Sequence, residues 1–347
     1  MRDTRLEPAA RHQRGLGVRL IYTFLREAGF QDIDQLTCDK ERCAGHLDEW
    51  VQYCYDSGSV AVGLCRNGLL GFVDKRWQLK GHIGLAWQSL RSWEEGEPLE
   101  LRKPWPIGLF LAALSVALAW EWWATATQLW LQFHAMLRPA EGCSLLWADI
   151  VLAEDLGDPS HGAAGVVRIR NPKTHRWGGR QQMVLLTDPW LIWWLRNLKA
   201  SFEPAAGQPL FPFTTATFNM RISRILTQLN MPSKSFTAAG LRAGGTTHLM
   251  RLGVQIEWLR HRGRWKSSHS MERYLQECGA VLAEIALSHE TKVSINKYAD
   301  LALAGVAQSA EMLAARASLG KRAYGLVSPF AKPAWTSRKS RQQQQFG

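Results

Sequence analysis

AAGLRAGGTTHL, residues 238–249, is the segment around which the rest of this chain can be organised. It leads into a helical pattern over 243–252 and places Arg242 at the predicted helix start, where a cation opposes the helix dipole. RGRW follows at 262–265 and supplies Trp265, and Tyr274 comes nine residues later within MERYLQE. A guanidinium, an indole N–H and a phenol therefore follow one another closely along the chain.

Two further motifs lie upstream of this segment. MLRPAEGCSLLWADI, residues 136–150, places Arg138 three residues before Glu141. Lys173 lies in RNPKTHR, between two segments rich in β-forming residues, VVRIR at 166–170 and QQMVLL at 181–186. This pattern predicts an antiparallel hairpin with Lys173 in its long loop.

The order of these motifs resembles the tyrosine recombinase (phage integrase-like) family. That family uses Arg, Lys in a β-hairpin, His-x-x-Arg, His or Trp, and Tyr, and the matching residues here are Arg138, Lys173, Arg242, Trp265 and Tyr274. Glu141 matches the acidic residue that often follows the first Arg. The match covers about residues 104–280, and GRW is similar to the version found in recombinases of eukaryotic mobile elements. Ala239 stands where the family has its His, which normally hydrogen-bonds the scissile phosphate.

The chemistry of a phosphodiester explains these residue types. Attack on phosphorus adds negative charge to its oxygens, and two guanidiniums, Arg138 and Arg242, can clamp those oxygens while staying charged. Trp265 can add one indole N–H donor. Tyr274 becomes a nucleophile only beside a positive site, and Lys173 is the candidate acid that protonates the leaving 5′ oxygen. The resemblance implies a 3′-phosphotyrosyl intermediate and a reaction that needs no cofactor.

Each residue also has a plain structural explanation. Arg138 and Glu141 are spaced as a helix-surface ion pair, and a lysine in a hairpin loop is usually solvated. Tyr274 belongs to a helical i, i+3, i+4, i+7 pattern, so it can also be a core residue of a helix over 271–283. The joint order of the motifs is what favours the recombinase interpretation.

Two other functions stay open at this stage. A DNA-binding remnant of a mobile element, catalytically impaired because of Ala239, predicts binding without cleavage. A type IB topoisomerase-like enzyme shares the tyrosine chemistry and predicts relaxation of supercoils without sequence choice. The leading hypothesis remains a site-specific recombinase or integrase.

The expected fold is mainly α with a small antiparallel β-sheet. We expect a flexible basic arm over 1–15, a helical core-binding-like domain over 16–98 and a catalytic domain over 104–290. A C-terminal helix, near 297–316, and a disordered basic tail complete the region 291–347. The proline-containing stretch EPLELRKPWPIG is the candidate linker, and 108–137 reads as strongly apolar helix. Asp188-Pro189 predicts the start of a capped helix.

Charge and cysteine usage bear on partners and compartment. Of the net charge of +12, the first twenty residues carry +3 and the residues after Glu311 carry +7. Basic ends favour double-stranded DNA as the partner, and the family acts as homo-oligomers on DNA. The six cysteines form no metal-binding pattern and suit a reducing compartment. We expect no metal, cofactor or membrane partner, and a nuclear location in a eukaryote or a cytoplasmic one otherwise.

Overall fold

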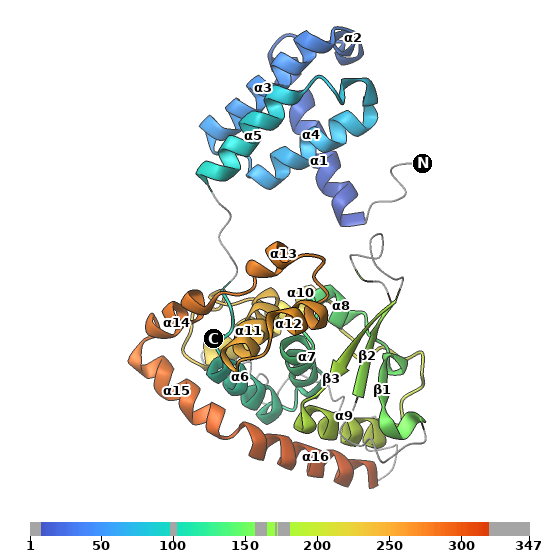
Figure 1. Ribbon diagram of the computed structural model, residues 1–347, viewed down its shortest axis with the longest axis vertical. Helices are drawn as coiled ribbons and strands as arrows, with labels where there is room; N and C mark the ends of the chain where they lie inside the picture. Colours follow the sequence, from blue (N-terminus) through green and yellow to red (C-terminus); the bar gives the residue numbers. More distant parts are fainter. Residues whose placement is uncertain (1–7, 98–102, 157–164, 171, 173–180, 319–347) are drawn as a thin grey trace, which may run out of the picture. The chain divides into compact units, whose positions relative to one another are not determined.

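The computed structural model describes residues 8–97, 103–156, 165–170, 172 and 181–318. The chain divides into two compact units, residues 1–100 and 101–347. The division falls within the stretch that the sequence suggests as a linker. The fold class is confirmed, because the described residues are mostly helical with one three-stranded antiparallel sheet (Figure 1).

The first unit is a small helical domain with its own core. Its helices are α1 (Pro8–Glu27), α2 (Ile33–Cys38), α3 (Lys40–Ser57), α4 (Val62–Lys75) and α5 (Gly84–Gly96). Gly17 and Gly68 let α1 and α4 cross closely, since a Cβ on Gly17 would lie 2.5 Å from the Cα of Gly68. Asp32 and Asp39 cap α2 and α3 by accepting backbone N–H groups. Residues 8–15, expected to be part of a flexible arm, are instead the first turns of α1.

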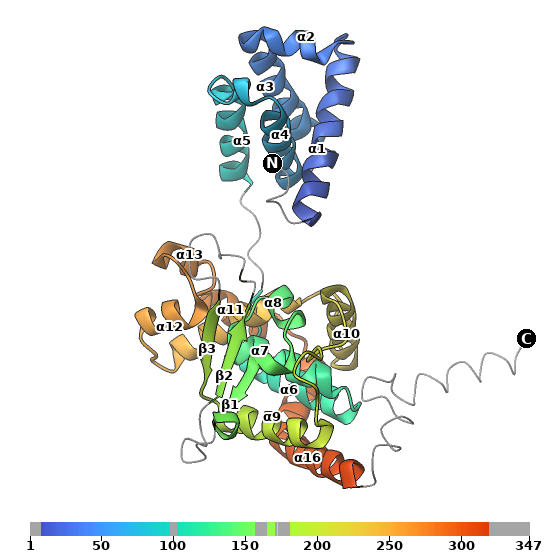
Figure 2. The same cartoon turned by 90° about the vertical axis from the view of Figure 1, so that its right-hand side faces the viewer.

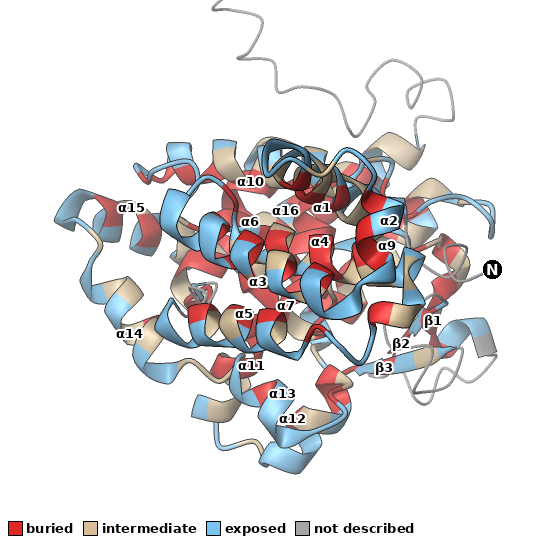
Figure 3. Ribbon diagram, turned by 90° about the horizontal axis from the view of Figure 1, so that it is seen from above, coloured by how far each residue is buried: buried red, intermediate tan, exposed pale blue. Residues whose placement is uncertain are grey.

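The second unit is built around two apolar helices, α6 (Ile107–Ala119) and α7 (Trp123–His134). The sequence pattern suggested one helical stretch over 108–137, but the chain turns between the two helices at Glu121, whose φ is +56°. Almost all of α6 is buried (Figure 3) because other helices cover it on several sides. Such a helix needs apolar residues all round, which is why its pattern shows no polar face.

The sheet of the second unit contains the predicted hairpin and one strand that the sequence did not reveal. Strands β1 (Ile150–Leu152), β2 (Gly165–Ile169) and β3 (Gln182–Leu186) pair antiparallel in the order β1-β2-β3. Figure 2 shows them side by side, with α9 (Pro189–Phe202) passing across one end of the sheet. Asp188 caps α9 as predicted, accepting hydrogen bonds from the backbone N–H groups of Trp190 and Leu191.

The remaining helices position the residues singled out in the sequence. They are α8 (Pro139–Cys143), α10 (Thr215–Gln228), α11 (Ala238–Arg251), α12 (Ile256–Gly263), α13 (Ser268–Glu272) and α14 (Glu277–Ile285). The helix expected over 271–283 is not continuous. It is replaced by α13, a turn that contains Tyr274, and α14, so the apolar spacing around Tyr274 does not mark a helix face.

The last two described helices belong to the second unit. α15 (His289–Asp300) and α16 (Ala302–Ser318) replace the single helix expected near 297–316. Ile295 of α15 and Val306 and Leu313 of α16 are buried in the same core as α6. The expected boundary near residue 290 is therefore not a boundary between separate cores. The basic tail after Ser318 lies outside the described residues.

Candidate active site

Arg138 and Glu141 meet at the start of α8. Pro139 occupies the first turn of this helix, and Glu141 reaches back to accept a hydrogen bond of 2.9 Å from the backbone N–H of Arg138. The Arg138 guanidinium donates to the other carboxylate oxygen at 2.5 Å. The Glu141 side chain is only 4% exposed and that of Arg138 is 22% exposed. The two residues therefore do not form the solvent-exposed helix-surface ion pair that their spacing also allowed.

Arg242 projects from α11 into the interior and is 1% exposed. Its position follows from the glycines of AAGLRAGG, because they let α11 lie directly against neighbouring backbone. A Cβ on Gly244 would stand 2.4 Å from the Trp105 carbonyl oxygen, and one on Gly245 would stand 1.9 Å from that of Phe133. The sequence placed Arg242 near the helix start, and the structure places it in the second turn.

Arg242 bridges segments that are far apart in the sequence. Its Nη1 donates to the carbonyl oxygen of Met136 at 2.8 Å, and its Nη2 donates to the carbonyl oxygen of Gly263. Nη1 also lies 4.0 Å from Oε2 of Glu141. The guanidinium thereby joins α11 to the segment before Arg138 and to the end of α12.

Trp265 follows directly after the end of α12. Gly263 is required beneath it, since a Cβ there would lie 1.7 Å from the indole ring. The Trp265 ring is 7% exposed and covers the Arg242 guanidinium, whose Cζ is 4.5 Å from the ring centroid. Its indole N–H is buried and has no acceptor among the described residues.

Tyr274 lies in the turn between α13 and α14. Its ring centroid is 5.0 Å from that of Trp265 and 5.3 Å from Cζ of Arg242. Thr247 of α11 holds the turn, because its hydroxyl donates to the Tyr274 carbonyl oxygen at 3.1 Å and accepts from the backbone N–H of Gln276. The structure therefore brings together four of the five predicted catalytic residues, Arg138, Arg242, Trp265 and Tyr274.

Sequence reasoning missed Arg264, which completes the charged cluster. Its Nη2 donates to Oε2 of Glu141 at 2.7 Å, and its side chain is 6% exposed. Glu141 is thus the shared acceptor of Arg138, Arg264 and, at longer range, Arg242. The RGRW motif points to its tryptophan, and nothing in a single sequence distinguishes the neighbouring arginine as buried.

The electrostatics of the cluster follow from burial of like charges. Burial, together with the nearby charges of Arg264 and Arg138, lowers the pKa of Arg242 to about 9, although Glu141 and Tyr274 act in the opposite direction. Burial also lowers the pKa of Arg264 to about 10. For Glu141, burial raises the pKa, but Arg264 and the hydrogen bond from the Arg138 backbone outweigh it and hold the pKa below its ordinary value. The cluster carries more positive than negative charge and suits an anion.

The two remaining predicted site residues, Lys173 and Ala239, contribute no described contact to the cluster. Lys173 lies outside the described residues, although the strands that flank its loop, β2 and β3, form as expected. Ala239 lies in the first turn of α11, one turn before Arg242, and its methyl group offers no donor. Among the nearby histidines, His261 and His269 are exposed, and His248 packs against the Phe133 ring at 5.9 Å.

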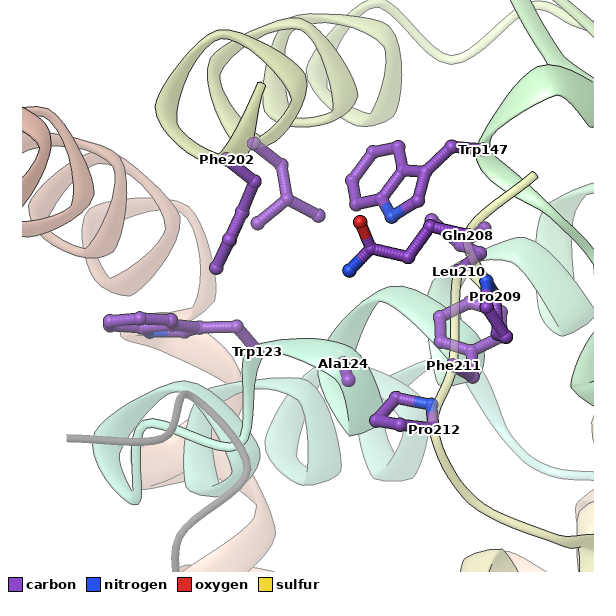
Figure 4. Close-up of a pocket in the computed structure, with 10 residues that line it drawn as sticks. Trp123, Ala124, Trp147, Phe202, Gln208, Pro209, Leu210, Phe211 and Pro212 are labelled. Carbon is purple, nitrogen blue, oxygen red and sulfur yellow. The ribbon is translucent and has the colours of Figure 1, made fainter. Parts of the chain in front are cut away.

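The described residues also bear on other kinds of site. They contain no group of three His, Cys, Asp or Glu side chains arranged to hold a metal ion. No described helix is long and apolar enough to cross a membrane. A separate apolar pocket of about 130 Å³ lies between Trp123, Trp147, Phe202 and Pro212 (Figure 4), and none of the predicted site residues lines it.

Comparison with known proteins gives structural neighbours only. No protein-family model matches the chain, and no curated protein matches it. The structure is similar to that of XerA recombinase and to that of XerH site-specific recombinase bound to its difH substrate in a pre-cleavage complex. Each has 13% sequence identity and a TM-score of 0.38, and each match covers 80% of this chain and 97% of the other. At this level of likeness, a proposal about function has to rest on the residues of the cluster.

Proposed function

We propose that the chain is a tyrosine recombinase that binds double-stranded DNA and cuts and rejoins its strands through Tyr274. The observation that carries this proposal is the position of Arg242. Its guanidinium lies against both the Trp265 and Tyr274 rings, and it shares Glu141 with Arg138. A nucleophile, two phosphate-binding cations and an indole donor thus converge from four separate segments of the chain.

The proposed reaction uses these four residues together with Lys173. The Tyr274 hydroxyl gives its proton to water and its oxygen attacks phosphorus, a P–O bond to the tyrosine forms, and the P–O5′ bond breaks. Arg138, Arg242 and the Trp265 N–H stabilise the charge that develops on the non-bridging oxygens. Lys173 gives a proton to the leaving 5′ oxygen, and attack by a 5′ hydroxyl on the 3′-phosphotyrosyl bond reverses the step and rejoins a strand.

In the free protein the proposed site is closed. Arg242 is 1% exposed and lies under the Trp265 and Tyr274 rings, so it contacts a phosphate only after Tyr274 moves. Tyr274 lies in the turn between α13 and α14, and the two hydrogen bonds of the Thr247 hydroxyl hold that turn until it opens. We therefore propose that the turn opens when a phosphate group, free or within DNA, binds the cluster. The helical first unit and the charged ends supply further DNA contacts, and copies of the chain assemble on paired sites.

A covalent adduct tests this function. The full chain is incubated with a pool of nicked duplexes that trap a phosphotyrosyl intermediate, and the modified peptide is mapped by mass spectrometry. We expect DNA attached at Tyr274 and none in the Tyr274→Phe variant. An adduct on another residue, or one that persists in the Phe variant, would contradict the proposal.

A second candidate is a DNA-binding protein that has lost cleavage, and Ala239 is the observation that favours it. Ala239→His distinguishes the two in the same assay. An adduct formed only by this variant means that the scaffold is intact and the native chain lacks one catalytic group. Tight DNA binding without an adduct from either protein supports the binding-only function.

A further inference from the structure

Arg264 adopts an unusual backbone conformation for an arginine. It ends α12 with φ +59° and ψ +40°, in the left-handed region that favours glycine. A glycine at this position would avoid the steric cost of a Cβ. The side chain must therefore contribute something that offsets this cost, and two roles are possible: neutralising Glu141 and binding a ligand.

Neutralising Glu141 does not use the whole guanidinium. Nη2 of Arg264 contacts Oε2 of Glu141 at 2.7 Å, whereas Nε and Nη1 are buried and have no acceptor among the described residues. Buried N–H groups without acceptors are costly, and a charged one is costlier than a neutral one. Two neighbouring donors are in the same state, Nε of Arg242 and Nε1 of Trp265.

The net positive charge of the cluster, like its unsatisfied N–H donors, favours an anion as the ligand. Three guanidiniums share one carboxylate, and burial lowers the pKa of Arg242 and Arg264 to about 9 and about 10. Arg138 already forms a two-oxygen contact with Glu141, so that carboxylate has little capacity left. An anion with several acceptor oxygens would satisfy the free donors and reduce the repulsion between the cations. A phosphate group has this chemistry.

We propose that Arg264 is a third phosphate-binding guanidinium, beside Arg138 and Arg242, which donates to a non-bridging oxygen of the scissile phosphate. This proposal rests on the proposed function for the identity of its ligand. Ala239 lies one helical turn from Arg242 and has no donor to offer, so Arg264 supplies a contact that this part of α11 does not.

Inorganic phosphate is the probe for this role. Its binding to the full chain is measured by calorimetry, with acetate as the control anion. Arg264→Gly removes the guanidinium and suits the left-handed backbone, so the variant should fold. We expect phosphate binding to weaken about 10- to 100-fold, as for loss of a charged hydrogen bond. Arg260→Gln removes a half-buried cation of α12 that pairs with Glu257 rather than with Glu141, and should bind phosphate as the native chain does.

A purely structural role for Arg264 predicts a different result. If Arg264 only neutralises Glu141, the glycine variant loses stability but keeps its phosphate affinity, and the proposal is overturned. Absence of phosphate binding by the native chain overturns it as well. Millimolar methylguanidine should restore phosphate binding to the glycine variant, because it can fill the space left by the side chain. If the glycine variant does not fold, Arg264→Lys is measured instead. A loss of about threefold or more in phosphate affinity supports the proposal, and unchanged phosphate affinity overturns it.

The adduct assay separates this proposal from the function on which it rests. A Tyr274 adduct that forms at the same rate in native chain and Arg264→Gly overturns the role of Arg264 and leaves the recombinase function standing. Phosphate binding that depends on Arg264, without any adduct, supports the anion site and contradicts strand cleavage.

Discussion

The guanidinium of Arg242 lies 4.5 Å from the centroid of the Trp265 ring, and the buried indole N–H of Trp265 has no acceptor within the part of the chain that the structure describes. The ring therefore has two separable roles. It covers a buried cation, which any aromatic ring can do, and it presents one donor, which only an indole can do.

Trp265→Phe separates these two roles. We expect the variant to keep an aromatic ring over Arg242 and to lose only about 1–2 kcal/mol of stability, because phenyl is smaller than indole. We expect adduct formation at Tyr274 to fall about 100-fold, the usual effect of losing one donor to a transition-state oxygen. Thermal unfolding and single-turnover adduct formation measure the two effects. Trp265→Ala is the contrast, since it also removes the ring and should cost about 3–5 kcal/mol of stability. Native rates of adduct formation in Trp265→Phe would show that the indole N–H has no part in the reaction.

Glu141→Gln should destabilise the protein by about 3–5 kcal/mol, because it leaves buried guanidiniums without their counter-charge. The pH dependence gives a sharper test. The pKa of Glu141 lies below its ordinary value of 4.5 in the folded protein. Its ionisation thus stabilises the fold fully above pH 4.5, and this stability is lost as the pH falls through the folded pKa.

Chemical denaturation of both proteins between neutral and acid pH measures this effect. The native chain should lose its advantage over Glu141→Gln as the pH drops below 4.5. A constant difference in the free energy of unfolding across that range would mean that Glu141 is not the ionised acceptor of the cluster.

Gly245→Ala should displace α11, because its Cβ would lie 1.9 Å from the carbonyl oxygen of Phe133, which is backbone and cannot turn away. We expect a loss of about 3 kcal/mol in stability together with loss of the site that α11 positions. Gly45→Ala in α3 is the matched control, since nothing lies within 4 Å of its Cβ position. That change should stabilise the protein by up to about 1 kcal/mol. Equal effects of the two substitutions on the unfolding temperature would rule out the close approach of α11 to Phe133.

Arg262→Met should cost about 2–4 kcal/mol although it removes no residue of the proposed site. The Arg262 guanidinium donates to the carbonyl oxygen of His134 from Nε and Nη2, at 3.1 and 2.9 Å, and to that of Leu185 from Nη1, at 2.9 Å. It therefore ties α12 to α7 and to β3. Arg260→Met, on the same helix, removes an ion pair with the exposed Glu257 and a contact with His261, and should change the free energy of unfolding by less than about 0.5 kcal/mol. Urea unfolding of the two variants compares them directly, and a similar cost for both would refute the bracing role of Arg262.

Local sequence patterns were sufficient for features that depend on neighbouring residues. Asp188-Pro189 gave the start of α9, and two β-rich segments gave the β2–β3 hairpin. The order of motifs also singled out Arg138, Arg242, Trp265 and Tyr274, which the fold brings together. Strand β1 escaped prediction because three residues are too few to show a period, and it forms only by pairing with β2.

Other features depend on contacts between segments that are distant in the sequence. The apolar spacing around Tyr274 suggested a helix face, but Thr247 holds that residue in a turn. In the sequence, Arg264 cannot be distinguished from a surface cation, but the fold buries it beside Glu141. Periodicity reports which local backbone a segment prefers, and a motif reports which chemistry is available. Burial and charge compensation arise only when the fold joins groups more than one hundred residues apart, as Arg242 and Met136 are.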